Sequence, residues 1–248
     1  MDKRRFTYEA TSVLIRFTDH ADVLPRAREI FSFQRPETLK LLLDAENNTL
    51  RNKLRSLPPL DSRGFRSCQT TALVGLERSF AENRPKVLVQ MATGAGKTFT
   101  AVTEAYRLLR YGGVKRVLFL VDTRNLGFQA EEEFRRYKPN DESRLFSELY
   151  NVLRLTSKAI PEDTHVCIST IQRMYSILKN EPLSEVAEDE YEVDERLRKP
   201  KEVQYNPRYP PEFFDLIIVD ECHRGSAKDD SNWKKILEYF NGATQIGM

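Results

Sequence analysis

A glycine-rich segment between an apolar run and a helical pattern constrains this chain more than any other feature. The sequence VLVQMATGAGKTFTA, residues 87–101, starts apolar, turns through Gly94 and Gly96, and continues without helix breakers. Phosphate groups bind where backbone N–H groups converge at a helix N-terminus, beside a cation and a hydroxyl that can ligate magnesium. Met91 replaces the first glycine of the strict pattern Gly-x-x-x-x-Gly-Lys-Ser/Thr, but the remainder is intact. We therefore predict a nucleotide-binding phosphate loop.

The residues of this loop have distinct expected roles. Lys97 would contact the β- and γ-phosphates of ATP, and the hydroxyl of Thr98 would ligate Mg²⁺. The candidate nucleotide-binding residues of the loop are Thr93, Gly94, Ala95, Gly96, Lys97 and Thr98. A chance match in an unrelated loop is the alternative, and the strand–loop–helix context argues against it.

A second motif lies about 120 residues further along, in FDLIIVDECH, residues 214–223. Its apolar part, residues 216–219, predicts a strand that ends just before Asp220 and Glu221. Ligands of open α/β sheets bind at the carboxyl ends of strands. Asp220 is expected to hold the magnesium shell, and Glu221 to orient and polarise the attacking water. Two adjacent acids can also be a simple turn, but together with the phosphate loop they predict an ATP hydrolase with Lys97, Asp220 and Glu221 as catalytic residues.

Strand and helix patterns alternate over residues 64–248. The run VLFLV, residues 117–121, is uninterrupted and apolar, as a strand buried on both faces should be. Alternation of this kind predicts an α/β fold, with a parallel sheet flanked by helices and joined by right-handed crossovers. The expected strands are 87–89, 117–121, 166–168, 216–219 and 245–247, and the expected helices are 68–83, 98–111, 125–137 and 233–240.

Two regions fall outside this pattern. Residues 1–63 predict a mainly helical linker, with a leucine-rich helix beginning at Pro36 and one short strand candidate at residues 13–17. Residues 179–212 are acidic, then basic, then proline-rich, and they predict a mobile surface insertion. We expect this insertion to belong to an ATP-binding lobe that spans residues 64–248.

Composition limits the class of protein. No apolar run approaches the roughly 18 residues of a membrane span, and the N-terminus lacks a secretory signal. Three widely spaced cysteines argue against a disulfide frame or structural zinc site and favour the cytoplasm. Residues 1–120 hold 21 Lys and Arg against 12 Asp and Glu, whereas the rest holds 18 against 25. A basic half fits a nucleic-acid surface or a solvated one, and composition alone favours the second.

The two motifs, TGAGKT and DECH, resemble those of superfamily-2 helicases and translocases, and longer strings resemble the motor of type I restriction enzyme R subunits. These strings lie within residues 28–248 and are REIFSF with RPETL, QMATGAGKT, VLFLVDTRNLG, STIQRMYS and DECHRGSAKDDSNW. The resemblance implies a first RecA-like motor lobe that uses ATP and Mg²⁺ to translocate double-stranded DNA, alongside modification and specificity subunits. It also implies a nuclease domain and a second motor lobe. We find neither, so we expect a fragment with weak hydrolysis on its own and with residues 1–63 as the remnant that joins nuclease to motor.

The resemblance also assigns roles to single residues. Gln69, in the string Arg66-Ser-Cys-Gln69, would read the adenine edge, and His223 would couple the acid pair to the next motif. Six residues in two strand-to-helix turns would contact the DNA backbone without reading its sequence: Thr123, Arg124, Asn125, Thr170, Gln172 and Arg173. Ordinary surface or turn residues are the alternative at each of these positions.

Two other functions fit the same motifs. The chain could be a general superfamily-2 helicase or remodelling ATPase, because activity classes of the superfamily share these residues. It could also be a catalytically incomplete nucleotide-binding remnant, since a lobe without its partner lacks part of the catalytic machinery. The intact residues Lys97, Thr98, Asp220 and Glu221 argue against loss of chemistry by mutation.

Overall fold

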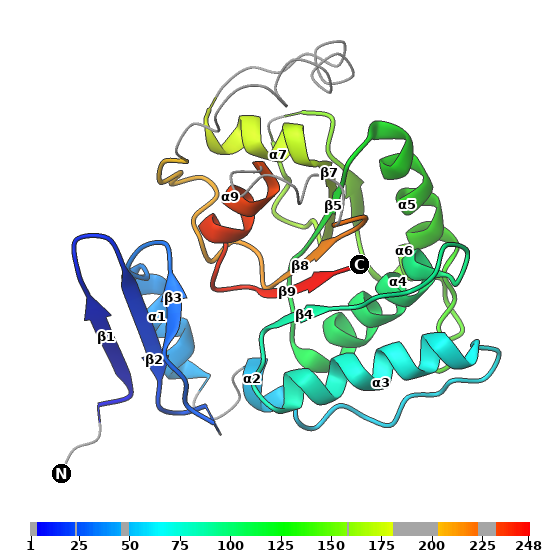
Figure 1. Ribbon diagram of the computed structural model, residues 1–248, viewed down its shortest axis with the longest axis horizontal. Helices are drawn as coiled ribbons and strands as arrows, with labels where there is room; N and C mark the ends of the chain where they lie inside the picture. Colours follow the sequence, from blue (N-terminus) through cyan, green and yellow to red (C-terminus); the bar gives the residue numbers. More distant parts are fainter. Residues whose placement is uncertain (1–3, 23, 46–49, 158, 181–202, 223–231) are drawn as a thin grey trace.

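A six-stranded parallel sheet forms the centre of the molecule, with strand order β4-β9-β8-β5-β7-β6 (Figure 1). The computed structural model describes residues 4–22, 24–45, 50–157, 159–180, 203–222 and 232–248. The strands of the sheet are β4 (Lys86–Leu88), β5 (Val117–Val121), β6 (Val152–Arg154), β7 (Val166–Thr170), β8 (Leu216–Val219) and β9 (Thr244–Gly247). Each neighbouring pair is parallel. The predicted α/β fold with a parallel sheet is confirmed.

Helices cover both faces of this sheet (Figure 1). One face carries α3 (Ser67–Ala81), α4 (Lys97–Arg107) with a π-helical turn η1 (Leu108–Gly112), α5 (Arg124–Arg136) and the short α6 (Phe146–Leu149). The other face carries α7 (Ile171–Leu178) and α9 (Asn232–Tyr239).

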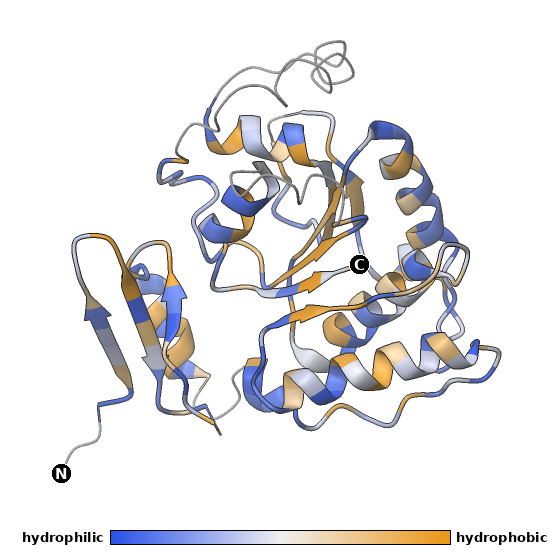
Figure 2. Ribbon diagram, viewed as in Figure 1, coloured by the Kyte–Doolittle hydropathy of each residue, from blue (hydrophilic) through white to orange (hydrophobic). Residues whose placement is uncertain are grey.

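The central strands divide their side chains between two apolar cores. In β5, Val117, Phe119 and Val121 pack with α3, α4 and α5, whereas Leu118 and Leu120 pack with α7 and α9. Successive side chains of a strand point to opposite faces, so a strand covered on both sides must be apolar throughout. Figure 2 shows the hydrophobic strands of the sheet between helices that carry both hydrophobic and hydrophilic residues.

Within the described part of residues 64–248, three elements were not predicted from the sequence: α6, β6 and α7. Strand β6 has three residues, all half-buried, which is too short for a periodic signal. Helix α7 follows β7 without a loop, because Thr170 both ends the strand and caps the helix. No turn residue therefore marks where α7 begins.

The sequence predicted a mainly helical N-terminal segment, and this prediction is wrong. An antiparallel sheet precedes the helices α1 and α2. Strands β1 (Phe6–Ala10), β2 (Ile15–Asp19) and β3 (Arg28–Ile30) pair in order, followed by α1 (Pro36–Asp44) and α2 (Leu50–Lys53). The buried residues of β2 are Phe17 and Asp19, and Asp19 pairs with Arg5 at 3.0 Å. A charged residue at an inward position interrupts the alternation of apolar and polar residues by which such a strand is recognised in a sequence.

Polar contacts tie this segment to the α/β part of the chain. The buried Arg51 donates from Nη1 to the hydroxyl of Thr244 at 2.9 Å, and Arg35 pairs with Glu212 at 2.7 Å. Glu212 lies in the region predicted to be a mobile insertion. Residues 203–212 of that region instead pack on the core, where the carbonyl of the buried Tyr209 accepts a hydrogen bond from the Tyr239 hydroxyl, 2.9 Å away. Residues 181–202 lie outside the described part.

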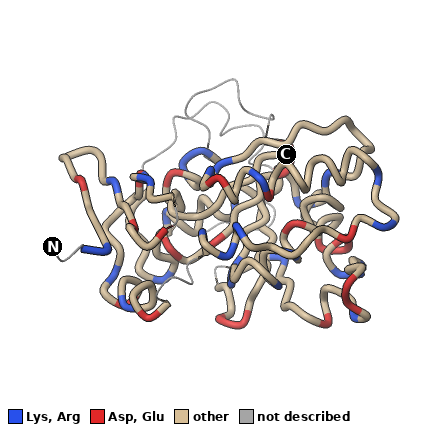
Figure 3. Tube along the Cα trace, turned by 90° about the horizontal axis from the view of Figure 1, so that it is seen from below, with Lys and Arg blue, Asp and Glu red and all other residues tan. Residues whose placement is uncertain are grey.

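Charged residues of both signs occur throughout the described chain. Figure 3 shows Lys and Arg interspersed with Asp and Glu along the backbone, so the positive excess of residues 1–120 is not one continuous run of basic residues. Within the described ranges, no helix is long and apolar enough to cross a membrane.

A buried carboxyl group lies in the middle of α4. Glu104 is 0% exposed, and neither of its carboxylate oxygens has a hydrogen-bond partner among the described residues. Burial raises the pKa of Glu104 well above its ordinary value of 4.5; the negative charge of Glu77 acts in the same direction, and Arg107 opposes it. Ionisation of Glu104 therefore does not lower the free energy of unfolding at pH values below the pKa of this group in the unfolded chain. The free energy of unfolding falls as the pH rises from that value toward the folded-state pKa.

We expect Glu104→Gln to raise the free energy of unfolding by about 1–3 kcal/mol at pH 8, because the amide keeps the shape but cannot ionise. The gain should shrink at pH 5, where the wild-type carboxyl is protonated in the folded state. Urea unfolding at both pH values measures the difference, with the exposed Glu132→Gln on α5 as the control. An equal gain at both pH values would contradict the ionisation argument.

Candidate nucleotide-binding site

The predicted phosphate loop connects β4 to α4, in the predicted order of strand, loop and helix. Gly94 and Gly96 adopt left-handed backbone angles, with φ of 75° and 89°, which glycine tolerates at little cost. Gly96 is the N-cap of α4, so the unpaired N–H groups of the first helical turn lie at the loop. A Cβ atom at Gly96 would also collide with the side-chain amide of Gln69. The loop therefore has the backbone that a bound phosphate requires.

The loop and the acid pair meet at one edge of the sheet. Lys97 Nζ lies 3.3 Å from Glu221 Oε1, and the two side chains are only 16% and 25% exposed. Asp220 follows β8 directly, is buried, and accepts a hydrogen bond from the backbone N–H of Glu221 at 3.1 Å. The two motifs recognised in the sequence thus form a single site, in which a cation and two carboxylates are partly shielded from water.

Glu221 has a backbone conformation that few residues with side chains adopt. Its φ is 54°, in the left-handed region. Neighbouring strands hold the chain on both sides of it: the N–H of Asp220 donates to Leu120 O at 2.9 Å, and that of Cys222 donates to Met248 O at 3.0 Å. Backbone strain held by its surroundings is concentrated at functional sites. The geometry therefore favours a functional role for this turn.

Gln69 is bonded to the phosphate loop. Its Oε1 accepts from the backbone N–H of Arg66 at 2.9 Å, and its Nε2 donates to Ala95 O at 3.1 Å. Arg66 itself donates from Nη1 to Gly94 O at 2.5 Å. A side-chain amide has two donor hydrogens and two acceptor lone pairs, so Gln69 keeps one of each for a base. The structure thus links the N-terminus of α3 to the loop, a contact that the sequence did not predict.

The residues present fit a nucleotide with magnesium. The expected magnesium ligands, Thr98 and Asp220, are the sequence neighbours of Lys97 and Glu221, whose side chains are in contact at 3.3 Å. In the described ranges, no three His, Cys, Asp or Glu side chains gather into a metal-binding group. Magnesium at nucleotide sites takes most of its ligands from phosphate and water, so one hydroxyl and one carboxylate suffice.

The residues proposed to contact DNA lie at two helix N-termini. Thr123 caps α5, with its hydroxyl accepting from Leu126 N at 3.3 Å, and Thr170 caps α7, accepting from Arg173 N at 3.2 Å. Strands β5 and β7 are parallel neighbours, so both helices begin at the same edge of the sheet. Helix N-termini carry partial positive charge and favour anions such as phosphate.

A pocket with three arginines lies between these two helices. Arg124, Arg154 and Arg173 line it together with Thr170 and Thr156. Sequence reasoning missed Arg154 and Thr156, because both depend on the unpredicted strand β6.

Arg154 is held firmly in this pocket. Its Nε donates to Glu131 at 3.0 Å, and its guanidinium carbon lies 3.8 Å from the ring centre of Phe128 on α5. Phe128 and Glu131 lie on α5, far from β6 in the sequence, so no local pattern marks Arg154.

The other predicted contacts are less accessible or lie elsewhere. Asn125 is exposed and Gln172 is half-buried, and neither lines the pocket. Arg173 is 3% exposed, so it lines the pocket from the interior side. His223, predicted to couple the acid pair to the next motif, lies outside the described residues.

The fold is a parallel α/β sheet flanked by helices, with the predicted phosphate loop and the acid pair in contact where the strands end. A family described as "Type III restriction enzyme, res subunit" matches residues 63–248, and the chain belongs to this family. The predicted resemblance to restriction enzyme motor subunits is confirmed at this level.

Curated relatives are subunits of type I restriction enzymes. The chain is 28% identical over 225 residues to the EcoKI endonuclease subunit of Escherichia coli (strain K12), which covers 91% of this chain and 17% of that subunit. It is 37% identical over 164 residues to the EcoAI endonuclease subunit of Escherichia coli, covering 66% of this chain and 16% of that subunit. The chain therefore spans less than a fifth of the length of these relatives. A solved fragment of an HsdR subunit from Vibrio vulnificus YJ016 aligns with 23% identity and a TM-score of 0.42, over 98% of this chain and 37% of that one.

Proposed function

We propose that this chain is the ATP-binding motor lobe of an ATP-dependent DNA translocase in a type I restriction-modification system. The observation that carries the proposal is the 3.3 Å contact between Lys97 Nζ and Glu221 Oε1, which joins the phosphate loop to the acid pair. The relatives, which are endonuclease subunits of type I restriction enzymes, support the choice of system.

Each residue of the site has a chemical task in this proposal. Lys97 and the N–H groups of residues 94–98 bind phosphate oxygens, while Thr98 and Asp220 hold Mg²⁺. Glu221 orients the attacking water and accepts its proton as the bond to phosphorus forms. Gln69 uses its remaining donor and acceptor to read the adenine edge. ATP, when bound, supplies the phosphoanhydride bond whose hydrolysis drives movement.

The duplex lies along the N-termini of α5 and α7 in this proposal. Arg124 and Arg154, with the capping threonines Thr123 and Thr170, contact phosphates and so position DNA without reading its sequence. Modification and specificity subunits would supply sequence recognition. Residues 1–63 join this lobe, residues 64–248, to a nuclease domain, and a second motor lobe completes the ATPase site.

ATP turnover with and without long duplex DNA, for the chain alone and with a separately made second lobe, tests the proposal. We expect low turnover alone and a rise with both additions, since an arginine supplied by a partner contributes about 10³–10⁵ in rate. Glu221→Gln should retain nucleotide binding and lose the turnover, whereas the exposed Glu238→Gln on α9 should match the wild type. A response to neither DNA nor lobe would indicate a nucleotide-binding remnant. Stimulation by single-stranded DNA alone would favour a general helicase.

A further inference from the structure

Residues 61–66 connect the N-terminal segment to α3 and end at the phosphate loop. Arg66 Nη1 donates to Gly94 O at 2.5 Å. The ring of Phe65 packs edge-on against Phe99 of α4, with 5.1 Å between ring centres. This short segment therefore leads directly into the residue that contacts the loop, Arg66, which is also the N-cap of α3.

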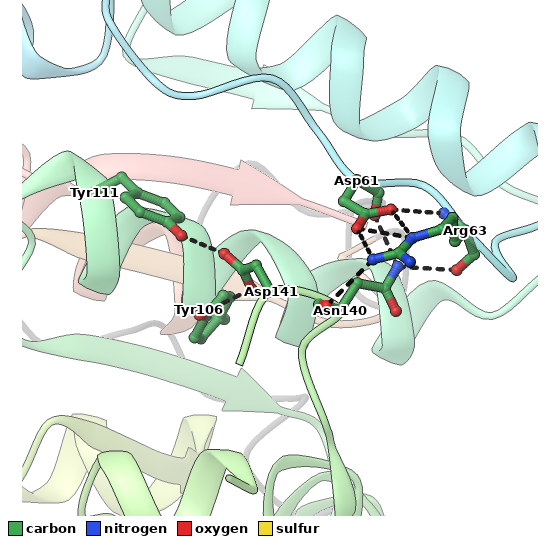
Figure 4. Close-up of polar contacts among 6 residues, drawn as sticks. All are labelled: Asp61, Arg63, Tyr106, Tyr111, Asn140 and Asp141. Atoms are coloured by element: carbon green, nitrogen blue, oxygen red, sulfur yellow. Dashed lines mark hydrogen bonds and ion pairs between the residues drawn. The ribbon is translucent and has the colours of Figure 1, made fainter. Parts of the chain in front are cut away.

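The segment forms no helix or strand of its own, so other residues must hold it. Asn140, on the loop after α5, donates from Nδ2 to both Asp61 O and Arg63 O, each at 2.9 Å (Figure 4). Arg63 in turn closes on the carboxylate of Asp61, with its shortest contact at 2.5 Å. One side-chain amide thus fixes two carbonyl groups three to five residues before Arg66.

The loop that carries Asn140 is itself anchored to α4 and η1. Asp141 accepts from the Tyr106 hydroxyl at 3.0 Å and also from the Tyr111 hydroxyl (Figure 4). Tyr106 is only 2% exposed and lies on the helix that begins at Lys97. Hydrogen bonds therefore connect the helix of the phosphate loop, the loop after α5 and the segment that leads to Arg66.

From this geometry we propose that Asn140 is a positioning residue for nucleotide binding, which acts through Arg66. It holds residues 61–63 so that the Arg66 guanidinium keeps its contact with the phosphate loop. The inference rests on the proposed function, because it takes that loop as the nucleotide site.

Asn140→Asp tests the proposal, because it keeps the size of the side chain and removes both donor hydrogens. We expect the Kd for Mg-ATPγS, measured by calorimetry on the full chain, to rise about three- to tenfold. Amide hydrogen exchange should become faster in residues 61–66. Asn140→Ser, which shortens the side chain without adding a charge, should act in the same direction and excludes repulsion by Asp61 as the cause.

Asn151→Asp is the matched control. Asn151 also donates twice from Nδ2, to Asp163 O at 3.1 Å and Asp163 Oδ2 at 2.8 Å. It precedes β6, however, which is the outermost strand on the side of the sheet opposite β4. The Kd of the Asn151→Asp variant for Mg-ATPγS should equal that of the wild type.

Three results would each contradict either the positioning role of Asn140 or the proposed function, and the measurements show which of the two fails. A wild-type Kd in both Asn140 variants would overturn the positioning role and leave the proposed function standing. Weaker binding without faster exchange in residues 61–66 would overturn it as well. If the wild-type chain itself does not bind Mg-ATPγS, the proposed function fails instead.

Discussion

Lys97→Ala is expected to weaken binding of Mg-ATP by about 30- to 4,000-fold. Removing one partner of a shielded, hydrogen-bonded charge pair costs about 2–5 kcal/mol, and each 1.4 kcal/mol is a tenfold change in Kd. Lys97 meets this condition, since its side chain is 16% exposed and its Nζ lies at the start of α4 beside the acid pair. The alanine would leave the phosphate charges of the nucleotide without their cation.

Calorimetric titration with Mg-ATPγS measures this effect directly. The exposed Lys115, at the amino end of β5 and thus at the other edge of the sheet, provides the control variant Lys115→Ala. We expect that control to bind like the wild type. If Lys97→Ala retained wild-type affinity, the nucleotide would bind elsewhere and the assigned site would be wrong.

Phe134→Ala is expected to lower the free energy of unfolding by about 3–5 kcal/mol. Phe134 is 0% exposed, and its ring packs edge-on against Phe119 of β5 and Phe146 of α6, with ring centres 5.5 and 5.1 Å away. The substitution leaves a cavity where α5 meets the sheet. A domain of this kind has a total stability of about 5–15 kcal/mol, so the loss is a large share of it.

The same helix offers a matched control for that prediction. Phe128 on α5 is 46% exposed, and its main partner is the guanidinium of Arg154. Phe128→Ala should cost about 1 kcal/mol or less, since an exposed cation–π contact contributes about 0.5–1 kcal/mol. Urea unfolding followed by circular dichroism measures both variants. Equal losses would contradict the assignment of Phe134 to the core.

The sequence was most informative where chemistry or two-sided burial restricts the choice of residue. The run Val117 to Val121 is apolar because both faces are covered, and the phosphate loop needs its two glycines for their left-handed angles. These constraints appear directly in residue type, so the strand, the loop and their order could all be predicted.

Other parts could not be predicted because their stability depends on distant partners. In β2 the inward Asp19 is acceptable only because Arg5 reaches it, which no local pattern reveals. Strand β6 is short and half-buried, so Arg154 carried no signal until the structure set it beside Arg124. Gln69 was recognised by type, but its bonds to Arg66 and Ala95 depend on how two segments meet.

The pairing of Lys97 with Glu221 has a consequence for the order of events in a turnover. The ammonium group of Lys97 lies 3.3 Å from the carboxylate of Glu221, and in the proposed function the same group binds phosphate oxygens. Under that proposal, binding of the nucleotide and release of the Glu221 carboxylate from Lys97 would be a single exchange of partners.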